Sequence, residues 1–415
     1  MNFRELALSQ AIQDALKVAH YAKATPVQEA VIPLVLEGQD IRAKAQTGSG
    51  KSASFVLPIL ELLTQRRGEG KKAKIKVLVL TPTRELTLQV SEAFHTFGKY
   101  LEVKPKAVAI IGGESIGDQL YQVQQGCDVL VATSGRFLDV LSKKQMNLSH
   151  IEFLVLDEAD KMLNLGFTEE LDAILEAIPS QRQNLMFSAT YPQKVLDLTA
   201  KITEKAVEVS IEEAQTVTKI EQRVFEVDRD KRGPLLRHLL QTEKYGQVLV
   251  FMANKRATDN IAMKFKKYGI SAQSFHGDLD QQERNETLQD FKQKKVQVLF
   301  ATDIAARGLD IDDIDCVVNF DLPRSPADYI HRIGRTARAG KSGRAISFID
   351  FESMEHFKLI EKRSEIKLKR EQVVGFELTG EAPKKVKGPA PVKGKGKSKK
   401  DRAREKAAQE GRDKL

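Results

Sequence analysis

The sequence predicts two consecutive α/β domains, each built around a parallel sheet, followed by a basic C-terminal tail. Short apolar, β-branched runs alternate with amphipathic stretches of about ten to fifteen residues. This alternation occurs across about 40–210 and again across about 220–365, and strands that alternate with helices form parallel sheets. The chain has 415 residues, more than the roughly 150 of one ordinary domain.

Each half contains six predicted strands. In the first half they are 40–45, 76–81, 106–110, 128–133, 152–157 and 184–189. In the second half they are 222–227, 247–252, 271–276, 296–301, 315–320 and 343–349. The polar segment 210–220 lacks an apolar period and is predicted to be a linker, so we expect domains at 1–209 and 221–365.

The chain after residue 365 is predicted to be a basic tail, 366–415. The stretch 362–373 still has a helical pattern, but the Lys-, Gly- and Pro-rich sequence that follows has little to bury, so we expect disorder after about 380. Residues 381–415 hold 13 Lys/Arg and five Asp/Glu, which is +8 of the chain's net charge of +9. This charge indicates an anionic partner.

Composition and cysteine usage exclude several protein classes. No run of about 18 apolar residues is present, and the N-terminus lacks the pattern of a signal peptide, so we expect neither a membrane protein nor an exported one. Cys127 and Cys316 lie in apolar, strand-like stretches, which predicts buried thiols in a cytoplasmic protein. The seven His residues lack metal-ligand spacing, which argues against structural zinc.

A phosphate-binding loop is predicted at AQTGSGKS, 45–52, between a strand and a helical run. Ala45 stands where the usual pattern has its first glycine. Gly48 and Gly50 allow backbone N–H groups to approach phosphate oxygens, and the following helix adds its dipole. We expect Lys51 to reach the β- and γ-phosphates and the Ser52 hydroxyl to ligate Mg²⁺. The alternative is a Gly-rich turn with a solvated lysine.

A metal and water site is predicted at DEAD, 157–160, directly after the apolar run FLVL. A carboxylate at the end of a buried strand near a P-loop suits Mg²⁺, and an adjacent carboxylate can orient or deprotonate the attacking water. We assign Asp157 to Mg²⁺, partly through water, and Glu158 to the attacking water. An isolated acidic quartet is more often a solvated loop, but the preceding strand favours the metal site.

Eight motifs, taken in order, make the sequence similar to the DEAD-box RNA helicases. They are AQTGSGKS (45–52), PTREL (82–86), GG (112–113), TSGR (133–136), DEAD (157–160), SAT (188–190), ATDIAARGLD (301–310) and HRIGRTAR (331–338). The resemblance covers nearly all of 1–365 and implies two tandem RecA-like domains. The compact length and short N-terminus are most similar to the bacterial RhlE-type subgroup.

The resemblance implies further contacts with ATP. The segment 21–28, YAKATPVQ, is similar to the family's adenine-recognition segment, and its Gln28 matches the glutamine that hydrogen-bonds the base. Phe3 matches an aromatic residue that stacks on adenine, and Asp310 matches a residue that contacts the ribose. The implied nucleotide-binding residues are Phe3, Tyr21, Gln28, Ala45, Gln46, Thr47, Gly48, Ser49, Gly50, Lys51, Ser52 and Asp310.

The resemblance also implies binding of RNA through sugar and phosphate, without sequence preference. The implied contacts are Arg84, Gly113, Thr133, Arg136, Arg256, His276, Thr302 and Gly308. Ser188 and Thr190, together with Asp160, are implied to couple hydrolysis to RNA binding. A Ser/Thr helix cap would explain the types of the first two residues equally well.

A helix is predicted at 326–339, with Ser325 as N-cap, Pro326 in the first turn and Gly340 as its stop. The basic stretch HRIGRTAR falls in its C-terminal half.

In such a helix, Arg335 lies about 40° from His331 and Arg338 about 20° to the other side, whereas Arg332 lies about 100° away. We therefore predict that His331, Arg335 and Arg338 share one face, which approaches ATP on the other domain. Arginine fingers neutralise the γ-phosphate in the transition state. By resemblance, Arg335 and Arg338 match the family's fingers. A basic helix face in water is the alternative.

These features together predict an RNA-dependent ATPase and helicase that converts ATP and water to ADP and phosphate. Domain closure on ATP·Mg²⁺ and single-stranded RNA would separate short duplexes locally, and hydrolysis would release the RNA. The alternative is an ATP-gated RNA clamp or RNP-remodelling scaffold; a DNA helicase is disfavoured by the DEAD and HRIGRTAR forms. We expect a monomer without membrane contact. Ribosomal and mRNA-decay complexes are candidate partners, between which the sequence does not choose.

Overall fold

Two parallel sheets, one in each half of the sequence, organise the chain in a computed structural model. The structure describes residues 2–45, 49–65, 73–203, 205–211, 220–306, 314–337 and 342–379. Within these residues, the first sheet has the order β3-β4-β2-β5-β6-β1-β7 and the second has the order β10-β11-β9-β12-β13-β8-β14. The paired strands are parallel throughout, as the alternation of strands and helices predicts.

The predicted strands all form, within two residues of their expected bounds. The first sheet contains β1 (Ile41–Lys44), β2 (Val77–Thr81), β3 (Ala107–Ile110), β4 (Val129–Thr133), β5 (Phe153–Leu156), β6 (Gln183–Ser188) and β7 (Val207–Ser210). The second contains β8 (Ile220–Glu226), β9 (Val248–Met252), β10 (Ala272–Phe275), β11 (Val298–Thr302), β12 (Cys316–Asn319), β13 (Gly343–Ile349) and β14 (Arg370–Glu371).

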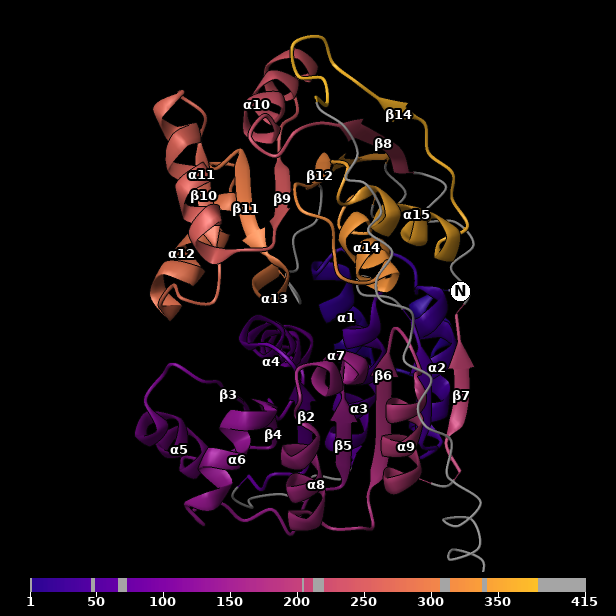
Figure 1. Ribbon diagram of the computed structural model, residues 1–415. Coiled ribbons are helices and arrows are strands. Elements are labelled where there is room, and N and C mark those ends of the chain that lie inside the picture. The colour runs from indigo at the N-terminus through magenta and orange to yellow at the C-terminus, as the bar shows by residue number, and fades with distance from the viewer. Residues whose placement is uncertain are drawn as a thin grey trace, which may run out of the picture. The chain divides into compact units, whose positions relative to one another are not determined.

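Helices cover both faces of the first sheet (Figure 1). One face packs against η1 (Phe3–Glu5), α1 (Gln10–Val18), α2 (Pro26–Leu36), α3 (Lys51–Gln65) and α4 (Arg84–Gly98). The other packs against α5 (Ile116–Gln124), α6 (Ser134–Ser142), α7 (Ala159–Asn164), α8 (Thr168–Ala177) and α9 (Gln193–Ile202). Alternate residues of β2 serve the two cores, Val77 and Val79 on one side and Leu78 and Leu80 on the other. Double burial explains why these strands are continuous apolar runs.

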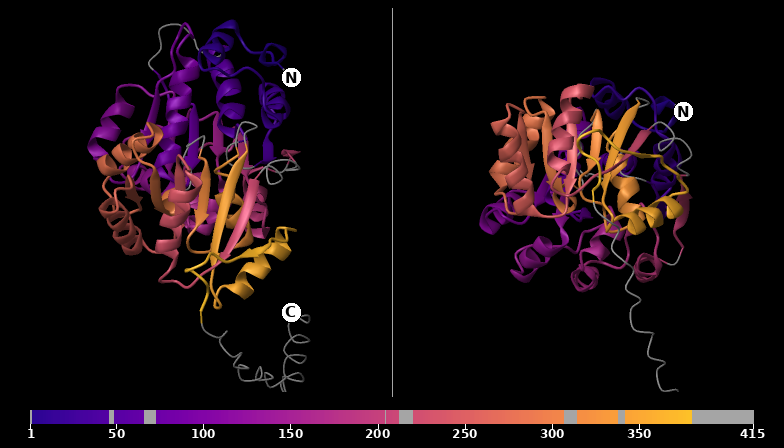
Figure 2. Two further views of the ribbon diagram at one scale, coloured as in Figure 1. Left: turned by 90° about the horizontal axis from the view of Figure 1, so that it is seen from above. Right: turned by 45° about the horizontal axis from the view of Figure 1, so that its top comes forward.

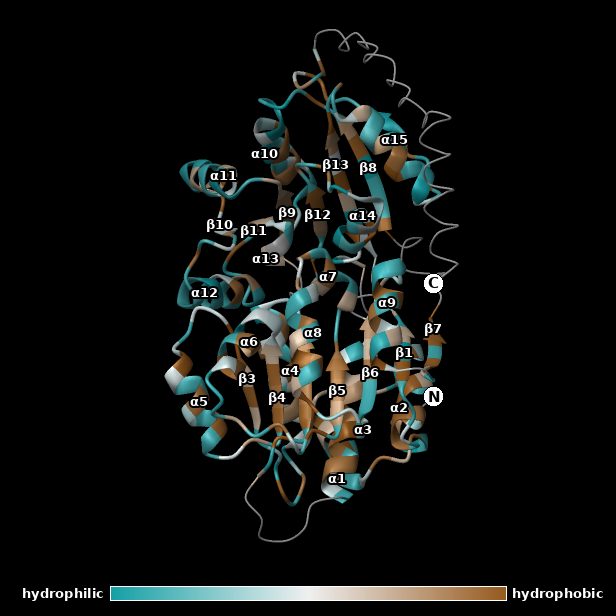
Figure 3. Ribbon diagram, turned by 60° about the horizontal axis from the view of Figure 1, so that its bottom comes forward, coloured by the Kyte–Doolittle hydropathy of each residue, from teal (hydrophilic) through white to brown (hydrophobic). Residues whose placement is uncertain are grey.

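The second sheet is covered in the same way (Figure 2). One face packs against α10 (Arg232–Glu243) and α11 (Lys255–Lys267). The other packs against α12 (Gln281–Lys292), α13 (Asp303–Ala306), α14 (Pro326–Ile333) and α15 (Met354–Arg363). Figure 3 shows the resulting contrast between apolar strands such as β4 and β5 and the polar outer surfaces of α11 and α12.

Two short edge strands were not predicted. β7 pairs with β1, and β14 pairs with β8 through Arg370 opposite Val224. The helical expectation for 362–373 is wrong beyond Arg363. The helix ends there, and Arg370 and Glu371 pair with β8 as an edge strand, where Glu371 also forms an ion pair with Arg223. Residues 212–219 of the expected linker and 380–415 of the expected tail lie outside the described residues.

The two cysteines are buried free thiols, as predicted, with exposed fractions of 1% for Cys127 and 0% for Cys316. Burial raises the pKa of the Cys127 thiol to about 12. Across the described part of the chain, no helix is both long enough and apolar enough to cross a membrane.

Candidate functional site

The predicted nucleotide residues meet at the carboxyl edge of the first sheet. β6 lies between β1 and β5, so the segments that follow these three strands are neighbours. Lys51 follows β1, Asp157 follows β5 and Ser188 ends β6. The carboxyl edge of a parallel sheet is where ligands bind in this class of fold.

The described part of the phosphate loop places Lys51 at the first position of α3, with an exposed fraction of 5%. Its Nζ donates a hydrogen bond to the carbonyl of Ala45 at 3.0 Å. The Lys51 side chain therefore bonds back to the residue that follows β1, and Ser52 comes next in the first turn of the helix. Gln46, Thr47 and Gly48 lie outside the described residues.

Gly50 joins the phosphate loop to the predicted adenine segment. Gln28 Nε2 donates to the carbonyl of Gly50 at 3.1 Å, and Gln28 Oε1 accepts from the backbone N–H of Thr25 at 2.9 Å. Gly50 has φ +93°, and a Cβ at this position would lie 2.5 Å from Gln28 Nε2 and 2.8 Å from Thr25 Oγ1. Only glycine allows this contact.

The two aromatic residues implied to lie near adenine differ in exposure. Phe3 is 3% exposed and belongs to the core of the first domain, whereas Tyr21 is 42% exposed. Their ring centroids are 6.4 Å apart, and Tyr21 also meets Phe97 edge-on at 5.3 Å. The ring that is open to a ligand in this arrangement is therefore that of Tyr21.

Asp157 has the properties of a metal ligand. Its side chain is buried, and its Oδ1 has no hydrogen-bond partner among the residues that the structure describes. Burial raises the pKa of Asp157 to about 6, against the opposing charge of Lys51. A buried carboxylate oxygen without a partner fits a cation such as Mg²⁺, which is usually held by one or two carboxylates together with substrate phosphates. Within the described ranges, no group of three or more acidic, His or Cys side chains forms a closed metal cage.

Glu158 adopts a left-handed backbone conformation, with φ 55° and ψ 46°, at the N-cap of α7. Such a conformation is unusual for a residue other than glycine and marks a position that the surrounding structure holds in place. The Glu158 side chain is 3% exposed and forms an ion pair with Lys161, in which Nζ lies 2.6 Å from Oε1.

Lys161, the partner of Glu158, was not among the predicted site residues. The i,i+3 spacing from Glu158 was the available signal, because residues with that spacing are neighbours on a helix. Its relevance depended on burial, which sequence alone does not reveal.

Asp160 connects the DEAD segment to β6 and its following loop. The backbone N–H of Asp160 donates to Ser188 Oγ at 3.2 Å, and the hydroxyl of Thr190 donates to Asp160 Oδ2 at 2.8 Å. Ser188 Oγ in turn donates to the carbonyl of Thr190 at 2.7 Å. The three residues implied to couple hydrolysis to RNA binding therefore form one hydrogen-bonded group.

The implied RNA residues of the first domain gather at the carboxyl ends of β2, β3 and β4. A Cβ on Gly113, which has φ +87°, would lie 2.6 Å from Arg84 Nη1. Arg136 Nε donates to the carbonyl of Ile111 at 2.8 Å, and Thr133 is the N-cap of α6. Burial and the nearby charge of Arg284 lower the pKa of Arg84. Clustered cations beside tightly turned backbone suit phosphate groups.

The implied RNA residues of the second domain differ in how accessible they are to a ligand. Arg256 is exposed at the start of α11, where Asn254 caps the helix, and Thr302 ends β11. His276 is only 4% exposed, its Nε2 lies 2.8 Å from Asp259 Oδ1, and its carbonyl accepts from Arg284. His276 therefore orders the loop after β10, and its ring is not offered to a ligand. Gly308 lies outside the described residues.

The predicted helix 326–339 is wrong at its C-terminal end. Ser325 caps the helix as expected, but α14 ends at Ile333 with Gly334 as its C-cap. The Thr336 side chain then donates to the carbonyl of Ile314, and these two residues form a β-bridge. This tertiary contact draws the chain away from the helix axis, so the angles expected from helical periodicity do not apply beyond Gly334.

The arginines of this stretch are nevertheless not equivalent. Arg332 is 3% exposed, binds the carboxylate of Asp303 at 2.6 Å through Nε and again through Nη2, and donates to Asn319 Oδ1 at 3.0 Å. Arg335 is also 3% exposed, but it lies within electrostatic range of Glu158. Arg338 and Asp310 lie outside the described residues.

His331 is mostly buried beside Lys161, and burial followed by the charge of that lysine lowers the pKa of His331 to about 4. The ring is therefore neutral at neutral pH. A small cavity of about 20 Å³ is lined by Lys161, Phe251, Asp303, Ala306, Asp328, His331, Arg332 and Arg335. Residues of both domains thus meet beside Lys161, the ion-pair partner of Glu158.

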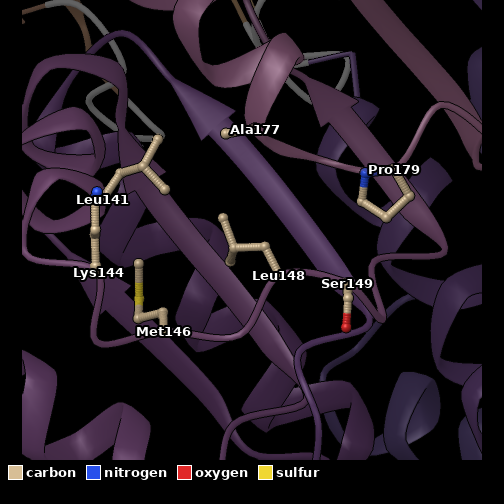
Figure 4. A pocket seen from close by; sticks show the side chains of 7 residues that line it. All are labelled: Leu141, Lys144, Met146, Leu148, Ser149, Ala177 and Pro179. Carbon is tan, nitrogen blue, oxygen red and sulfur yellow. The ribbon is translucent and has the colours of Figure 1, made fainter.

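A larger surface cavity, of about 440 Å³, lies elsewhere on the first domain (Figure 4). It is lined by Leu141, Lys144, Met146, Leu148, Ser149, Ala177 and Pro179. These residues belong to the C-terminal ends of α6 and α8 and to the segments that follow them, at the amino edge of the sheet. The cavity is therefore separate from the site described above.

Comparison with known proteins identifies the family. The DEAD/DEAH box helicase family matches residues 25–198, and the helicase conserved C-terminal domain matches residues 230–340. The chain is 38% identical over 369 residues to the DEAD-box ATP-dependent RNA helicase CshA of Geobacillus kaustophilus. The alignment covers 89% of this chain and 78% of that protein.

Solved structures agree. The structure of Saccharomyces cerevisiae Dbp5 bound to RNA and ADP BeF3 has a TM-score of 0.78 and 30% identity, covering 89% of this chain and 95% of that one. That of Mss116p bound to ssRNA and AMP-PNP has a TM-score of 0.81 and 27% identity, covering 89% and 78%. Fold, motifs and relatives all lead to one conclusion: the chain belongs to the DEAD-box family of ATP-dependent RNA helicases.

Proposed function

We propose that the protein is an RNA-dependent ATPase that binds single-stranded RNA through its backbone and separates short duplexes locally when its two domains close on ATP. The observation that carries this proposal is the convergence on Glu158. Its carboxylate lies at the carboxyl edge of the first sheet. It interacts electrostatically with Lys51 and with Arg335 of the second domain. A nucleophile-activating carboxylate, a phosphate-binding lysine and an arginine finger are the parts that phosphoryl transfer to water requires.

In this proposal the first domain binds ATP·Mg²⁺. The phosphate loop 45–52 and Lys51 hold the phosphates, Ser52 and Asp157 hold Mg²⁺, and Gln28 recognises adenine with Tyr21 and Phe3 nearby. The metal neutralises phosphate charge when bound. Glu158 accepts a proton from the attacking water. Burial alone would favour its neutral form, but the charges of Lys161 and Lys51 outweigh burial and keep the carboxylate ionised for that task. Arg335, Arg338 and Asp310 complete the site from the second domain.

RNA is the proposed partner of the cluster around Arg84, Gly113, Thr133 and Arg136, with Arg256, Thr302 and Gly308 in the second domain. The related Dbp5 and Mss116p structures, which contain RNA, support this assignment. Ser188, Thr190 and Asp160 would transmit RNA binding to the catalytic carboxylates, because they bond directly to one another.

Several finer assignments belong to the same proposal. We place the first domain at 1–209 and extend the predicted second domain, 221–365, to 220–378, because β8 begins at Ile220 and Val373 and Phe376 pack against the core of that domain. We place the protein in the cytoplasm as a monomer, with ribosomal or mRNA-decay complexes as candidate partners. The bacterial relative described above is named CshA, so it lends no support to the RhlE-type subgroup.

The proposal is tested by measuring ATP hydrolysis with single-stranded RNA and with single-stranded DNA of the same sequence. We expect strong stimulation by RNA only. Glu158→Gln should retain ATP and RNA binding but lose turnover by about 100-fold or more. Glu152→Gln is the matched control, because Glu152 precedes β5 at the opposite edge and pairs with Lys76. Equal turnover in Glu158→Gln and wild type would refute the role of Glu158 in hydrolysis. A short-duplex unwinding assay distinguishes a helicase from an RNA clamp.

A further inference from the structure

The buried ion pair between Glu158 and Lys161 has no part in the motifs that identify the family. We propose that Lys161 is a positioning residue, which holds the carboxylate of Glu158 in the orientation needed to activate the attacking water. This inference rests on the proposed role of Glu158 as the water-activating carboxylate. It assigns to Lys161 an indirect effect on ATP hydrolysis, exerted through Glu158.

The geometry of the ion pair fixes the position of both side chains. Lys161 Nζ lies 2.6 Å from Glu158 Oε1, and the two side chains are 5% and 3% exposed. A buried charge must be paired, and a charge-assisted hydrogen bond this short fixes the direction of both groups. A lysine at the surface would add little, because solvent screens exposed ion pairs and their side chains remain mobile.

The backbone also holds Glu158 and Lys161 together. The N–H of Lys161 donates to the carbonyl of Glu158 at 2.9 Å and to Asp160 Oδ1 at 3.0 Å. Glu158 itself is in the left-handed region. An unfavourable backbone conformation persists only where its surroundings determine it, and here the turn of α7 and the ion pair do so together.

The counter-charge of Glu158 comes from its own domain. Arg335 of the second domain also acts electrostatically on Glu158 and on Lys161. Lys161, however, lies in α7, the helix that Glu158 caps, so its ion pair with Glu158 does not depend on the second domain. The role proposed for Arg335 is instead at the γ-phosphate, where a finger acts.

The charge balance supports this reading. The buried carboxylate of Glu158 lies near two cations, Lys161 and Lys51, and it is Lys161 that bonds to it directly. Without it, a buried carboxylate next to Asp157 would face a like charge with less compensation.

The test combines Lys161→Met with Glu158→Gln in a double-mutant cycle on RNA-stimulated ATP hydrolysis. Methionine keeps the unbranched shape and most of the length of the side chain and removes the charge. We expect Lys161→Met to lower kcat by about 10- to 100-fold, because small misplacements of a catalytic group have effects of that size. KM for ATP should stay within about twofold, since the phosphate loop is untouched. Lys161→Arg, which restores the charge, should recover most of the loss.

The Glu158→Gln background separates a positioning role from a structural one. If Lys161 acts through Glu158, Lys161→Met should cause no further loss there, as measured in single turnovers with excess enzyme. An equal loss in both backgrounds, an unchanged kcat, or a change confined to KM would overturn the inference. Thermal melting checks each variant, and Lys161→Gln replaces Lys161→Met if the latter does not fold.

The same experiment distinguishes failure of this inference from failure of the proposed function. Normal turnover in Glu158→Gln alone would remove the role of Glu158, and the inference would fall with it. Slow turnover in Glu158→Gln with normal turnover in Lys161→Met would leave the proposed function intact and overturn only the role of Lys161.

Discussion

At the scale of single residues, Gly50 shows how two functional segments depend on one another. The carbonyl of Gly50 accepts a hydrogen bond from Gln28, and the space that its missing side chain leaves is filled by the Gln28 amide and the Thr25 hydroxyl. The phosphate loop and the adenine segment therefore share a contact. A change at Gly50 should disturb both.

We predict that Gly50→Ala weakens ATP binding by at least about tenfold, because the new Cβ would lie 2.5 Å from Gln28 Nε2 and because φ is +93°. Gly38→Ala is the matched control. Gly38 also has positive φ, +80°, but a Cβ there has nothing within 4 Å. In both variants, backbone strain should lower the free energy of unfolding by about 1 kcal/mol. Titration with a fluorescent ATP analogue checks the difference, and equal nucleotide affinity in the two variants would contradict the shared contact.

Asp157 is a second residue at which function opposes stability. Burial raises the pKa of Asp157 to about 6, above its ordinary value, so the folded state binds a proton more tightly than the unfolded state does. At pH 7 the charged carboxylate therefore costs stability, and this cost disappears as the pH falls below about 4.

We expect Asp157→Asn to raise the melting temperature at pH 7 by a few degrees when melting is measured without Mg²⁺. With Mg²⁺ present, the same variant should not hydrolyse ATP. The gain should fade toward pH 4. Asp128→Asn serves as a contrast, because Asp128 is also buried but accepts a hydrogen bond from the backbone of Lys106 at 2.9 Å. That variant should melt at a lower temperature. Scanning calorimetry across pH 4–8 decides the matter, and a lower melting temperature for Asp157→Asn would show that the carboxylate is not a burden.

At the scale of elements, α14 shows where sequence patterns stop being informative. Its start is encoded locally, since Ser325 caps the helix and Pro326 fits its first turn. Its end depends on Thr336, which bonds to Ile314, a residue far away in sequence. No local periodicity contains that contact, and the predicted helix was therefore too long. The short strands β7 and β14 escaped prediction for the same reason, because edge pairing defines them and no apolar run does.

Arg332 lies in α14 and Arg335 follows its end, and we expect substitutions at the two positions to affect different properties: stability at Arg332 and ATP hydrolysis at Arg335. Arg332 ties the end of β12 to α13 through Asn319 and Asp303. Arg332→Ala should lower the free energy of unfolding by about 3 kcal/mol, at the lower end of the range for a broken buried pair, because the Asp303 side chain is 30% exposed. Arg335→Ala should leave stability closer to wild type but reduce ATPase rate by about 10³-fold. Urea unfolding and ATPase assays on both variants check this, and the reverse pattern would contradict the assignment.

At the scale of the whole molecule, the parallel sheets and the nucleotide residues were predictable because they rest on local signals. Apolar runs mark buried strands, and motifs follow directly after them, as at Lys51 and Asp157. The pairing of Glu158 with Lys161, the burial of His276 and the end of α14 were not predictable, since each depends on contacts between segments that the fold brings together.

The C-terminal region should divide into two parts with different roles. Residues up to Leu378 belong to the compact unit that contains both sheets. Glu371 pairs with Arg223, while Val373 and Phe376 pack against the core of the second domain. Removing residues after 365 should therefore lower the melting temperature of the protein. Removing only residues after 379 should leave it unchanged.

The shorter deletion should act on RNA binding instead. It removes the 13 Lys/Arg and five Asp/Glu of 381–415, a net charge of +8. Because neutralised phosphates release counterions, the logarithm of RNA affinity should fall less steeply with the logarithm of salt concentration after deletion. ATPase activity without RNA should be unaffected, since the catalytic residues lie before position 365. Fluorescence anisotropy with single-stranded RNA, from about 50 to 300 mM KCl, measures the slope. A deletion that lowers affinity by the same factor at every salt concentration would mean that the tail does not bind through its charge.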